Sequence, residues 1–429
     1  METIDARASE RQLVTVRIPT WWTLAGLIAG LTAGLLVARS TAVDEVLAVT
    51  APIGALWLRA LQATIIPLVA GLLVIGIAQM VRAARAGAAA RLMLALVAGV
   101  LLFSGISSAL LTPLLLDLFP APGGAQGMLS AGSEAQEIPG LGEFIQSLVA
   151  PNMIAAAAET AMLPLTLFLA AFAVAVARLP VGQRDTLLAF FRALANAMLL
   201  IIGWVLWVAP VGVFALAVGV GAESGSGAFA TLGHYILIVV ATGTVVLVAG
   251  YLLAWFGGGI APSRFARALL PAQTVGLSTQ SSLASLPAML VSAQRLGIRE
   301  RSAEFALPLA VAIFRGTSPA MNLAVAIYVA HITGTTLTPI TLAAGILVAF
   351  VIAVGSVSLP GTISFVISVG PIAVAMGVPI EPLALLVAVE MMPDLMRTVG
   401  NVTMDVAVTT AVDRHAGDED EEFAATVQP

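Results

Sequence analysis

The chain has 429 residues, of which 59% are hydrophobic and only 10% are charged, and its formal net charge is −5. A soluble domain carries about 25% charged residues, so the composition excludes an ordinary soluble globular protein. The lack of cysteine excludes disulfides and thiolate metal sites. The sequence shows no glycine-rich phosphate loop, zinc-ligand spacing or basic patch for nucleic acid. We therefore expect no cofactor and no nucleic-acid partner.

Eight apolar stretches predict helices that cross a lipid bilayer, because about 20 apolar residues suffice for one crossing. In chain order they cover 20–38, 45–80, 88–118, 145–178, 185–220, 228–257, 303–331 and 379–412. Arginine clusters flank these spans on one side, whereas the loops at 119–144 and 221–227 contain no Arg or Lys. Basic residues mark the cytoplasmic side of a membrane protein. Both ends should therefore be cytoplasmic, with residues 1–19 as an amino-terminal segment and 414–429 as a disordered acidic tail.

Two further apolar stretches, 262–294 and 336–376, must return to their starting side if the arginine pattern is to hold. Each is interrupted at its centre by a Ser/Pro cluster, Ser281–Pro287 in the first and Gly355–Gly361 in the second. Proline and glycine interrupt helical hydrogen bonding, and open backbone at membrane depth needs protein or water beside it. Paired interrupted segments point to a transporter binding site. The alternative is a pair of ordinary proline-kinked helices.

The last span carries a row of polar and ionisable residues within an apolar stretch. The spacings of 4, 3, 1, 3 and 4 place them within one stripe of a helix: Glu390, Asp394, Arg397, Thr398, Asn401 and Asp405. Ionisable groups at bilayer depth are costly and normally face a pathway or a binding site. This stripe is therefore the main candidate functional feature.

These motifs together resemble the glutamate transporter family, the dicarboxylate/amino acid:cation symporters. The resemblance rests on the hairpin tips Ser281–Pro287 and Leu359–Gly361, on the Asp-x-x-Arg-Thr-x-x-Asn-x-x-x-Asp pattern from Asp394 to Asp405, and on Ile66–Val69 and Ala209–Leu216. It implies an all-α membrane protein with eight transmembrane helices and two re-entrant helical hairpins. It further implies a homotrimer that works as an elevator-type transporter in a bacterial inner membrane.

The resemblance also divides the chain into two domains. The scaffold, or trimerisation, domain would comprise 45–80 and 145–257, with the first transmembrane helix, 20–38, beside it. The transport domain would comprise 88–118 and 262–413. The sixth span, 228–257, lies inside the first set of ranges, although the resemblance places it with the transport domain.

The resemblance assigns roles to the polar residues. Arg397 would bind an acidic substrate side chain, in keeping with the bidentate fit of guanidinium to carboxylate. Asp394 would accept the substrate ammonium group and Asn401 would donate to its α-carboxylate. Further substrate-binding residues would be Ser281, Ser282, Thr317, Pro360, Gly361 and Thr398. The alternatives are that Arg397 only pairs with Asp394 or Glu390, and that the serines serve turn chemistry alone.

The chain departs from the family pattern at the seventh span. The family's Asn-Met-Asp-Gly-Thr is here Ile313-Phe314-Arg315-Gly316-Thr317, so two oxygen ligands of a sodium site are replaced. Asp405 and Asn401 would belong to that site. We expect the Arg315 guanidinium to occupy the sodium space and neutralise Asp405, because a paired buried charge costs less than an unpaired one. Alternatively, Arg315 faces solvent or lines the substrate cavity. An ungapped count along the third span offers no side-chain oxygen to the site, since it places Leu96, Gly99 and Val100 there.

The coupling ion is left open by the sequence, so sodium is uncertain. Glu390 is a candidate proton carrier, and the alternative is a salt bridge with an arginine. His234 and His331 are far apart in sequence and are expected to be structural.

The leading interpretation is a secondary active transporter, not an enzyme, that moves acidic amino acids such as aspartate or glutamate. The alternatives are a C4-dicarboxylate carrier or a sodium-independent or proton-coupled exchanger. An anion channel or a substrate sensor is also open. An intramembrane hydrolase that uses Ser281 or Ser282 would need a base, and the sequence does not place one beside them.

Overall fold

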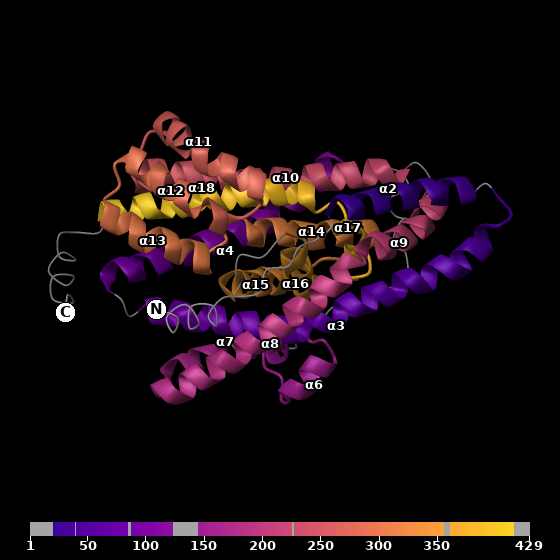
Figure 1. The fold of residues 1–429 in the computed structure, drawn as a ribbon, viewed down its shortest axis with the longest axis horizontal. Helices are drawn as coiled ribbons and strands as arrows, with labels where there is room; N and C mark the ends of the chain where they lie inside the picture. The colour runs from indigo at the N-terminus through magenta and orange to yellow at the C-terminus, as the bar shows by residue number, and fades with distance from the viewer. Residues whose placement is uncertain are drawn as a thin grey trace, which may run out of the picture.

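The computed structural model describes residues 20–38, 40–84, 87–122, 145–224, 227–355 and 361–415. All regular elements in these ranges are helices (Figure 1). In chain order they are α2 (Thr20–Val37), α3 (Val43–Ala83), α4 (Ala88–Leu118), α6 (Met153–Ala158), α7 (Met162–Arg178), α8 (Val181–Trp207), α9 (Ala209–Ser224), α10 (Gly227–Leu252) with the π-helical turn η2 (Leu253–Gly257), α11 (Pro262–Thr279), α12 (Ser282–Leu296), α13 (Glu300–Ile313), α14 (Ser318–Thr333), α15 (Pro339–Gly355), α16 (Gly361–Ala375), α17 (Leu383–Leu386) and α18 (Met391–His415).

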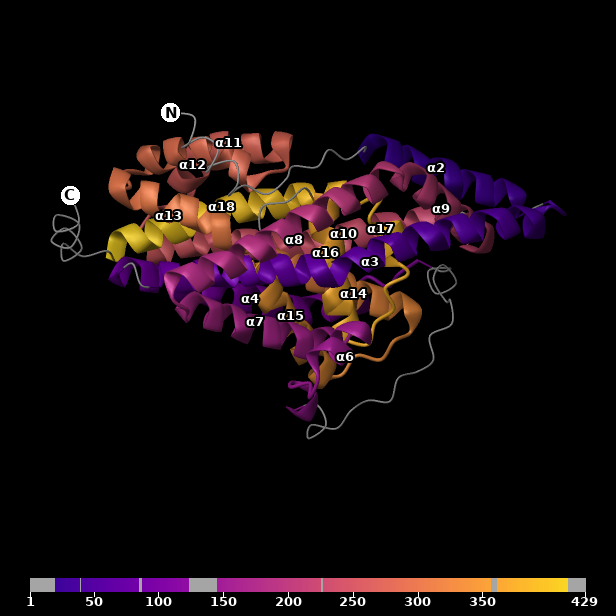
Figure 2. The ribbon, with the colours of Figure 1, turned by 60° about the horizontal axis from the view of Figure 1, so that its bottom comes forward.

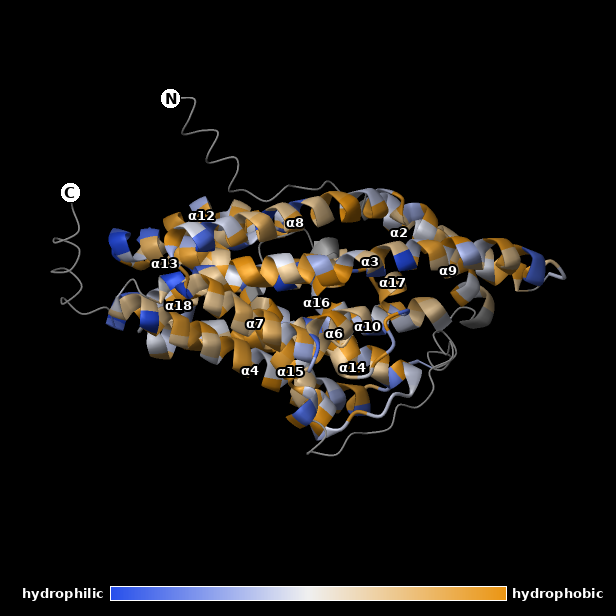
Figure 3. Cartoon of the chain, turned by 90° about the horizontal axis from the view of Figure 1, so that it is seen from below, coloured by the Kyte–Doolittle hydropathy of each residue, from blue (hydrophilic) through white to orange (hydrophobic). Residues whose placement is uncertain are grey.

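Five helical stretches in the described part of the chain are long and apolar enough to cross a membrane. They are Val43–Arg82, Ala88–Leu118, Val181–Trp207, Gly227–Phe256 and Glu300–Thr333. In Figure 3 most of the length of the helices is orange, the colour of hydrophobic residues. Hydrophilic residues, in blue, gather at the end of the molecule where α13 and the carboxyl end of α18 lie. The chain is thus an integral membrane protein, whereas the number of eight crossings remains a prediction.

Four of the predicted spans are each divided into two helices in the structure. The predicted span 145–178 is divided into α6 and α7, 185–220 into α8 and α9, 303–331 into α13 and α14, and 379–412 into α17 and α18. At the α8–α9 break, Pro210 cannot donate to the preceding helical turn. Close to this break, the carbonyl of Val205 accepts a hydrogen bond from the Trp57 indole Nε1, at 2.9 Å.

Both predicted interrupted stretches form two helices around a central break. α11 packs against α12, and α15 packs against α16, as Figure 2 shows for the first pair. In the first hairpin the turn is made by Gln280, whose φ of 51° lies in the left-handed region. Ser281 then caps α12, since its Oγ accepts from Ala284 N at 3.2 Å. The second tip, which includes Ser358 and Pro360, lies outside the described residues.

The helices pack in two groups that share α15 and α16. α3, α7, α8 and α9 contact one another, with α2 along α9. α4, α10, α11, α12, α13, α14 and α18 form the second group (Figure 1). α10 packs along α18, α14 and α4, so the sixth span lies with the helices of the predicted transport domain. The division into two moving domains is still a prediction.

The contact of α2 with α9 is made through glycines at four-residue spacing. Gly26, Gly30 and Gly34 face the backbone of α9, and a Cβ added at these positions would lie 2.4, 2.5 and 2.2 Å from the carbonyl oxygens of Pro210, Phe214 and Val218, respectively. Small residues at this spacing let two membrane helices approach closely. The first span is thereby fixed to α9.

A buried ionic cluster as candidate functional site

The polar residues of α18 are buried. Asp394, Arg397, Thr398, Asn401 and Asp405 are each at most 4% exposed. Glu390 is the residue directly before α18, which begins at Met391. Pro393 restricts this end, since its ring cannot be accommodated deeper in a helix. Glu390 is still held near the helix, because its carbonyl accepts from Asp394 N at 2.9 Å.

Arg397 is paired on one side and free on the other. Its Nη1 donates to Glu390 Oε1 and to Asp394 Oδ1, the latter at 2.9 Å. Arg397 thus pairs with both carboxylates, as the alternative interpretation expected, but only through Nη1. Arg397 Nε and Nη2 and Asp394 Oδ2 are buried and have no hydrogen-bond partner among the described residues. Unsatisfied buried polar groups are rare and costly, so this set calls for a ligand.

A break between α13 and α14 lies against the middle of α18. The Asn401 Oδ1 accepts a hydrogen bond from Thr317 N at 3.0 Å, and the Thr317 hydroxyl lies 2.6 Å from the same oxygen and 2.8 Å from Arg397 O. Gly400 allows this approach, because an added Cβ would lie 2.2 Å from Thr317 Cγ2. With its oxygen turned to the break, Asn401 keeps its amide nitrogen for a ligand.

The third span does bring a side-chain oxygen to the break. Ser104 Oγ on α4 accepts from Ala320 N at 3.0 Å. Pro319 has no N–H, so Ser104 satisfies a donor at the amino end of α14 that lacks an intrahelical partner. The placing of Leu96, Gly99 and Val100 at the sodium site stays a prediction. No motif signalled Ser104, because its role depends on the packing of α4 against α14.

Arg315 lies inside this break. It is 8% exposed, so the alternative that it faces solvent is wrong. Its guanidinium is attracted by the charges of Asp394 and Asp405 and repelled by that of Arg397. Both Asp405 oxygens are buried and accept no hydrogen bond from the described residues. Ile313, at the end of α13, is buried and contributes no oxygen.

The first hairpin tip lies beside Thr398. A Cβ added at Gly276 would be 3.4 Å from Thr398 Cγ2 and 3.5 Å from Ser285 Oγ. Ser285 Oγ donates to Ser281 O at 2.9 Å, and Ser281 Oγ accepts from Ala284 N within the same turn. Within the described part of the chain, no hydrogen bond joins Ser281 or Ser282 to the α18 cluster. Of the second tip, Gly361 begins α16 and Pro360 is outside the described residues.

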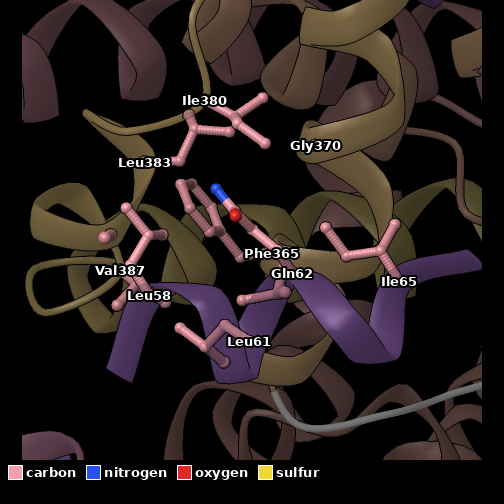
Figure 4. Close-up of a pocket in the computed structure, with 11 residues that line it drawn as sticks. Leu58, Leu61, Gln62, Ile65, Phe365, Gly370, Ile380, Leu383 and Val387 are labelled. Atoms are coloured by element: carbon pink, nitrogen blue, oxygen red, sulfur yellow. The ribbon is translucent and has the colours of Figure 1, made fainter. Parts of the chain in front are cut away.

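A separate pocket lies between α3 and the α16–α17 region (Figure 4). Gln62 is its polar lining residue, and the other lining residues are apolar: Leu58, Leu61, Ile65, Phe365, Val366, Gly370, Ile380, Leu383, Ala384 and Val387. A carboxylate would lose its hydration there without gaining a charged partner. This pocket therefore does not suit an acidic ligand, unlike the cluster around Arg397. Among the described residues no group of three or more His, Asp or Glu could hold a metal ion.

The predicted structural histidines differ in their surroundings. His331 ends α14 at the surface. His234 joins two helices, since its Nδ1 lies 3.0 Å from the Tyr328 hydroxyl and its Nε2 lies 2.9 Å from Phe119 O. Tyr235, the next residue, donates from its hydroxyl to Glu390 Oε2 at 3.4 Å. No sequence motif connects Tyr235 with the cluster.

Comparison with known proteins places this chain in a family. The model of the sodium:dicarboxylate symporter family matches residues 20–415. The proton/sodium-glutamate symport protein of Bacillus subtilis is 27% identical over 412 residues, covering 91% of each chain. The proton/glutamate-aspartate symporter of Escherichia coli is 26% identical and covers 82% of each chain. C4-dicarboxylate transport protein 1 of Pseudomonas aeruginosa is 27% identical over 66% of this chain and 63% of its own. The chain belongs to the sodium:dicarboxylate symporter family.

Proposed function

We propose that the chain is a secondary transporter of acidic amino acids such as aspartate or glutamate. The unpartnered atoms of Arg397 and Asp394 carry this proposal. The free Nε and Nη2 atoms of Arg397 offer two parallel donors, which match the two oxygens of a carboxylate. The free Asp394 Oδ2 beside them is an acceptor for an ammonium group. Asn401 would donate to the second carboxylate of the same substrate.

A C4-dicarboxylate is the second candidate substrate, since relatives carry that name. A diacid could use Arg397 equally well. It would, however, leave Asp394 Oδ2 as a buried carboxylate oxygen without a donor, beside a ligand of like charge. The geometry therefore favours a substrate with an ammonium group.

The charges of the cluster support coupling to a proton. Three carboxylates, of Glu390, Asp394 and Asp405, face two guanidinium groups, of Arg397 and Arg315, so the formal sum is −1. An acidic amino acid with a further charge of −1 would raise this to −2, which is costly at membrane depth. Uptake of one cation offsets the difference. Because Arg315 lies near Asp405, we propose that Glu390 takes a proton and that sodium is not required.

The wider architecture is proposed on the same basis. The two groups of helices would be a scaffold and a transport domain that moves as an elevator within a homotrimer. The two interrupted stretches would be re-entrant hairpins that enclose the substrate. The arginine pattern and the bacterial relatives support an inner-membrane location with both termini in the cytoplasm.

Purified protein in proteoliposomes tests the proposed function. Saturable uptake of labelled aspartate, with counterflow driven by unlabelled aspartate or glutamate, is expected of a carrier. Competition by succinate and by alanine distinguishes the dicarboxylate and neutral amino acid classes. Uptake that does not saturate would indicate a channel, and binding without uptake would indicate a sensor. A preference for succinate over both acidic amino acids would replace the leading substrate class with the second.

A further inference from the structure

One buried tyrosine contacts the ionic cluster from outside α18, and a second buried tyrosine packs on the first. Tyr235 on α10 and Tyr328 on α14 are both 0% exposed. Their rings meet edge to face, with centroids 5.3 Å apart. The Tyr235 hydroxyl donates to Glu390 Oε2, while the other oxygen of this carboxylate receives Arg397 Nη1. Glu390 is therefore held by one donor at each oxygen.

Tyr328 is itself fixed, which fixes Tyr235. Its hydroxyl donates to Thr231 O at 3.0 Å and lies 3.0 Å from His234 Nδ1. Thr231 and His234 belong to α10, and His234 also contacts the end of α4 through Phe119 O. A column of contacts thus leads from His234 through Tyr328 and Tyr235 to Glu390.

We propose that Tyr235 is a positioning residue for the substrate-binding edge of Arg397. Glu390 is the residue directly before α18, and its carboxylate is held by its contacts with Tyr235 and Arg397. With the Tyr235 hydroxyl in place, the carboxylate stays on Nη1, and the Nε–Nη2 edge remains open. Without that hydroxyl, Glu390 can rotate toward the open edge and compete with the carboxylate of the substrate. The inference rests on the proposed function, in which that edge binds the substrate.

Tyr235→Phe tests the proposal, because it removes the hydroxyl and keeps the ring against Tyr328. Hydrogen bonds to charged groups are strong enough that loss of one is expected to weaken aspartate binding about tenfold. Tyr251→Phe is the matched control. Tyr251 belongs to α10 as well, but it lies at the carboxyl end of that helix, several turns after Tyr235. Its ring packs edge to face on Phe265, with centroids 5.2 Å apart. Its aspartate affinity should equal that of the unmodified protein.

A double-mutant cycle separates positioning from general damage. In a Glu390→Gln background the charge that competes for Arg397 is gone, so Tyr235→Phe should have little further effect on affinity. Unchanged affinity in Tyr235→Phe alone would overturn the proposal. An equal loss with and without Glu390→Gln would also overturn it, since Tyr235 would then act only through packing. If purified Tyr235→Phe is not monodisperse, the same double-mutant cycle is measured with Tyr328→Phe in its place. Tyr328→Phe should lower aspartate affinity as well, by a smaller factor.

Arg397→Lys distinguishes failure of this proposal from failure of the proposed function. Lysine keeps a positive charge near Glu390 but has no planar two-donor edge. If aspartate affinity is unchanged in Arg397→Lys, the substrate does not bind that edge and the proposed function fails. If Arg397→Lys loses affinity while Tyr235→Phe does not, only the role of Tyr235 is wrong.

Discussion

Asn401 Oδ1 accepts the backbone N–H of Thr317 at 3.0 Å, which joins the α13–α14 break to the polar face of α18. The break places Arg315 beside the ionic residues of α18, and the hydrogen bond satisfies a donor that a broken helix leaves open at membrane depth. The site is therefore built by two elements that depend on each other.

Arg397→Lys should lower the affinity for acidic amino acids by about one to two orders of magnitude, because a charge-assisted hydrogen bond contributes about 1.5–3 kcal/mol. Arg397→Ala should in addition lower thermal stability, since it leaves Glu390 and Asp394 as buried carboxylates without their shared partner. Isothermal titration calorimetry with aspartate measures the first effect and a thermal unfolding assay the second. Equal aspartate affinity in Arg397→Lys and the unmodified protein would show that Arg397 does not bind the substrate.

Asp394→Asn should lower the affinity for amino acids more than the affinity for dicarboxylates. The carboxylate pairs with an ammonium group, which succinate and malate lack, and Asp394 Oδ2 is free to do so. Competition against labelled aspartate, with glutamate and succinate in parallel, reports the ratio. An equal loss for both classes would mean that Asp394 serves Arg397 or ion coupling and not the ammonium group.

Thr317→Val should destabilise the protein by about 1–3 kcal/mol, because it removes a hydroxyl from a buried network of Asn401 and Arg397 O. Thr274→Val is the matched control, since Thr274 is exposed on α11 and bonds only within its own helix. Its thermal unfolding should change by less than that of Thr317→Val. Similar shifts in both variants would show that the contact of Thr317 with α18 adds no stability.

The extent of the longer helices and the break between α11 and α12 could be predicted from the sequence, whereas the break between α13 and α14 could not. α3, α4 and α10 follow the predicted spans because an uninterrupted apolar run has one stable form in a bilayer. The α13–α14 break escaped prediction because Gly316 and Pro319 lie within such a run, and Pro319 is compatible with the first turn of α14. The α18 stripe followed from helical spacing alone. Ser104 and Tyr235 could not be found, because their contacts depend on how α4 and α10 pack against distant segments.

Gly30→Ala should destabilise the protein, in contrast to Gly99→Ala. A Cβ at Gly30 would lie 2.5 Å from Phe214 O, so α2 and α9 would have to separate. No atom lies within 4 Å of a Cβ added at Gly99 of α4. Alanine favours a helix over glycine by up to about 1 kcal/mol, so Gly99→Ala should be neutral or stabilising. Thermal unfolding in detergent compares the two, and equal effects would contradict the close packing of α2 on α9.

Substrate binding should depend little on sodium. Arg315 adds a fixed positive charge near Asp405, and Ile313 offers no oxygen, so a sodium ion at this place would be repelled and poorly coordinated. We expect the Arg315 charge to compensate that of Asp405 instead, because an uncompensated charge is costly at membrane depth. Arg315→Ala should therefore lower thermal stability, and Ile313→Asn combined with Arg315→Asp should create part of a sodium requirement. The measurement is aspartate affinity during a sodium titration from zero at constant ionic strength, in the unmodified protein and in the double variant. A steep, cooperative gain of affinity with sodium in the unmodified protein would show that Arg315 has not replaced the ion.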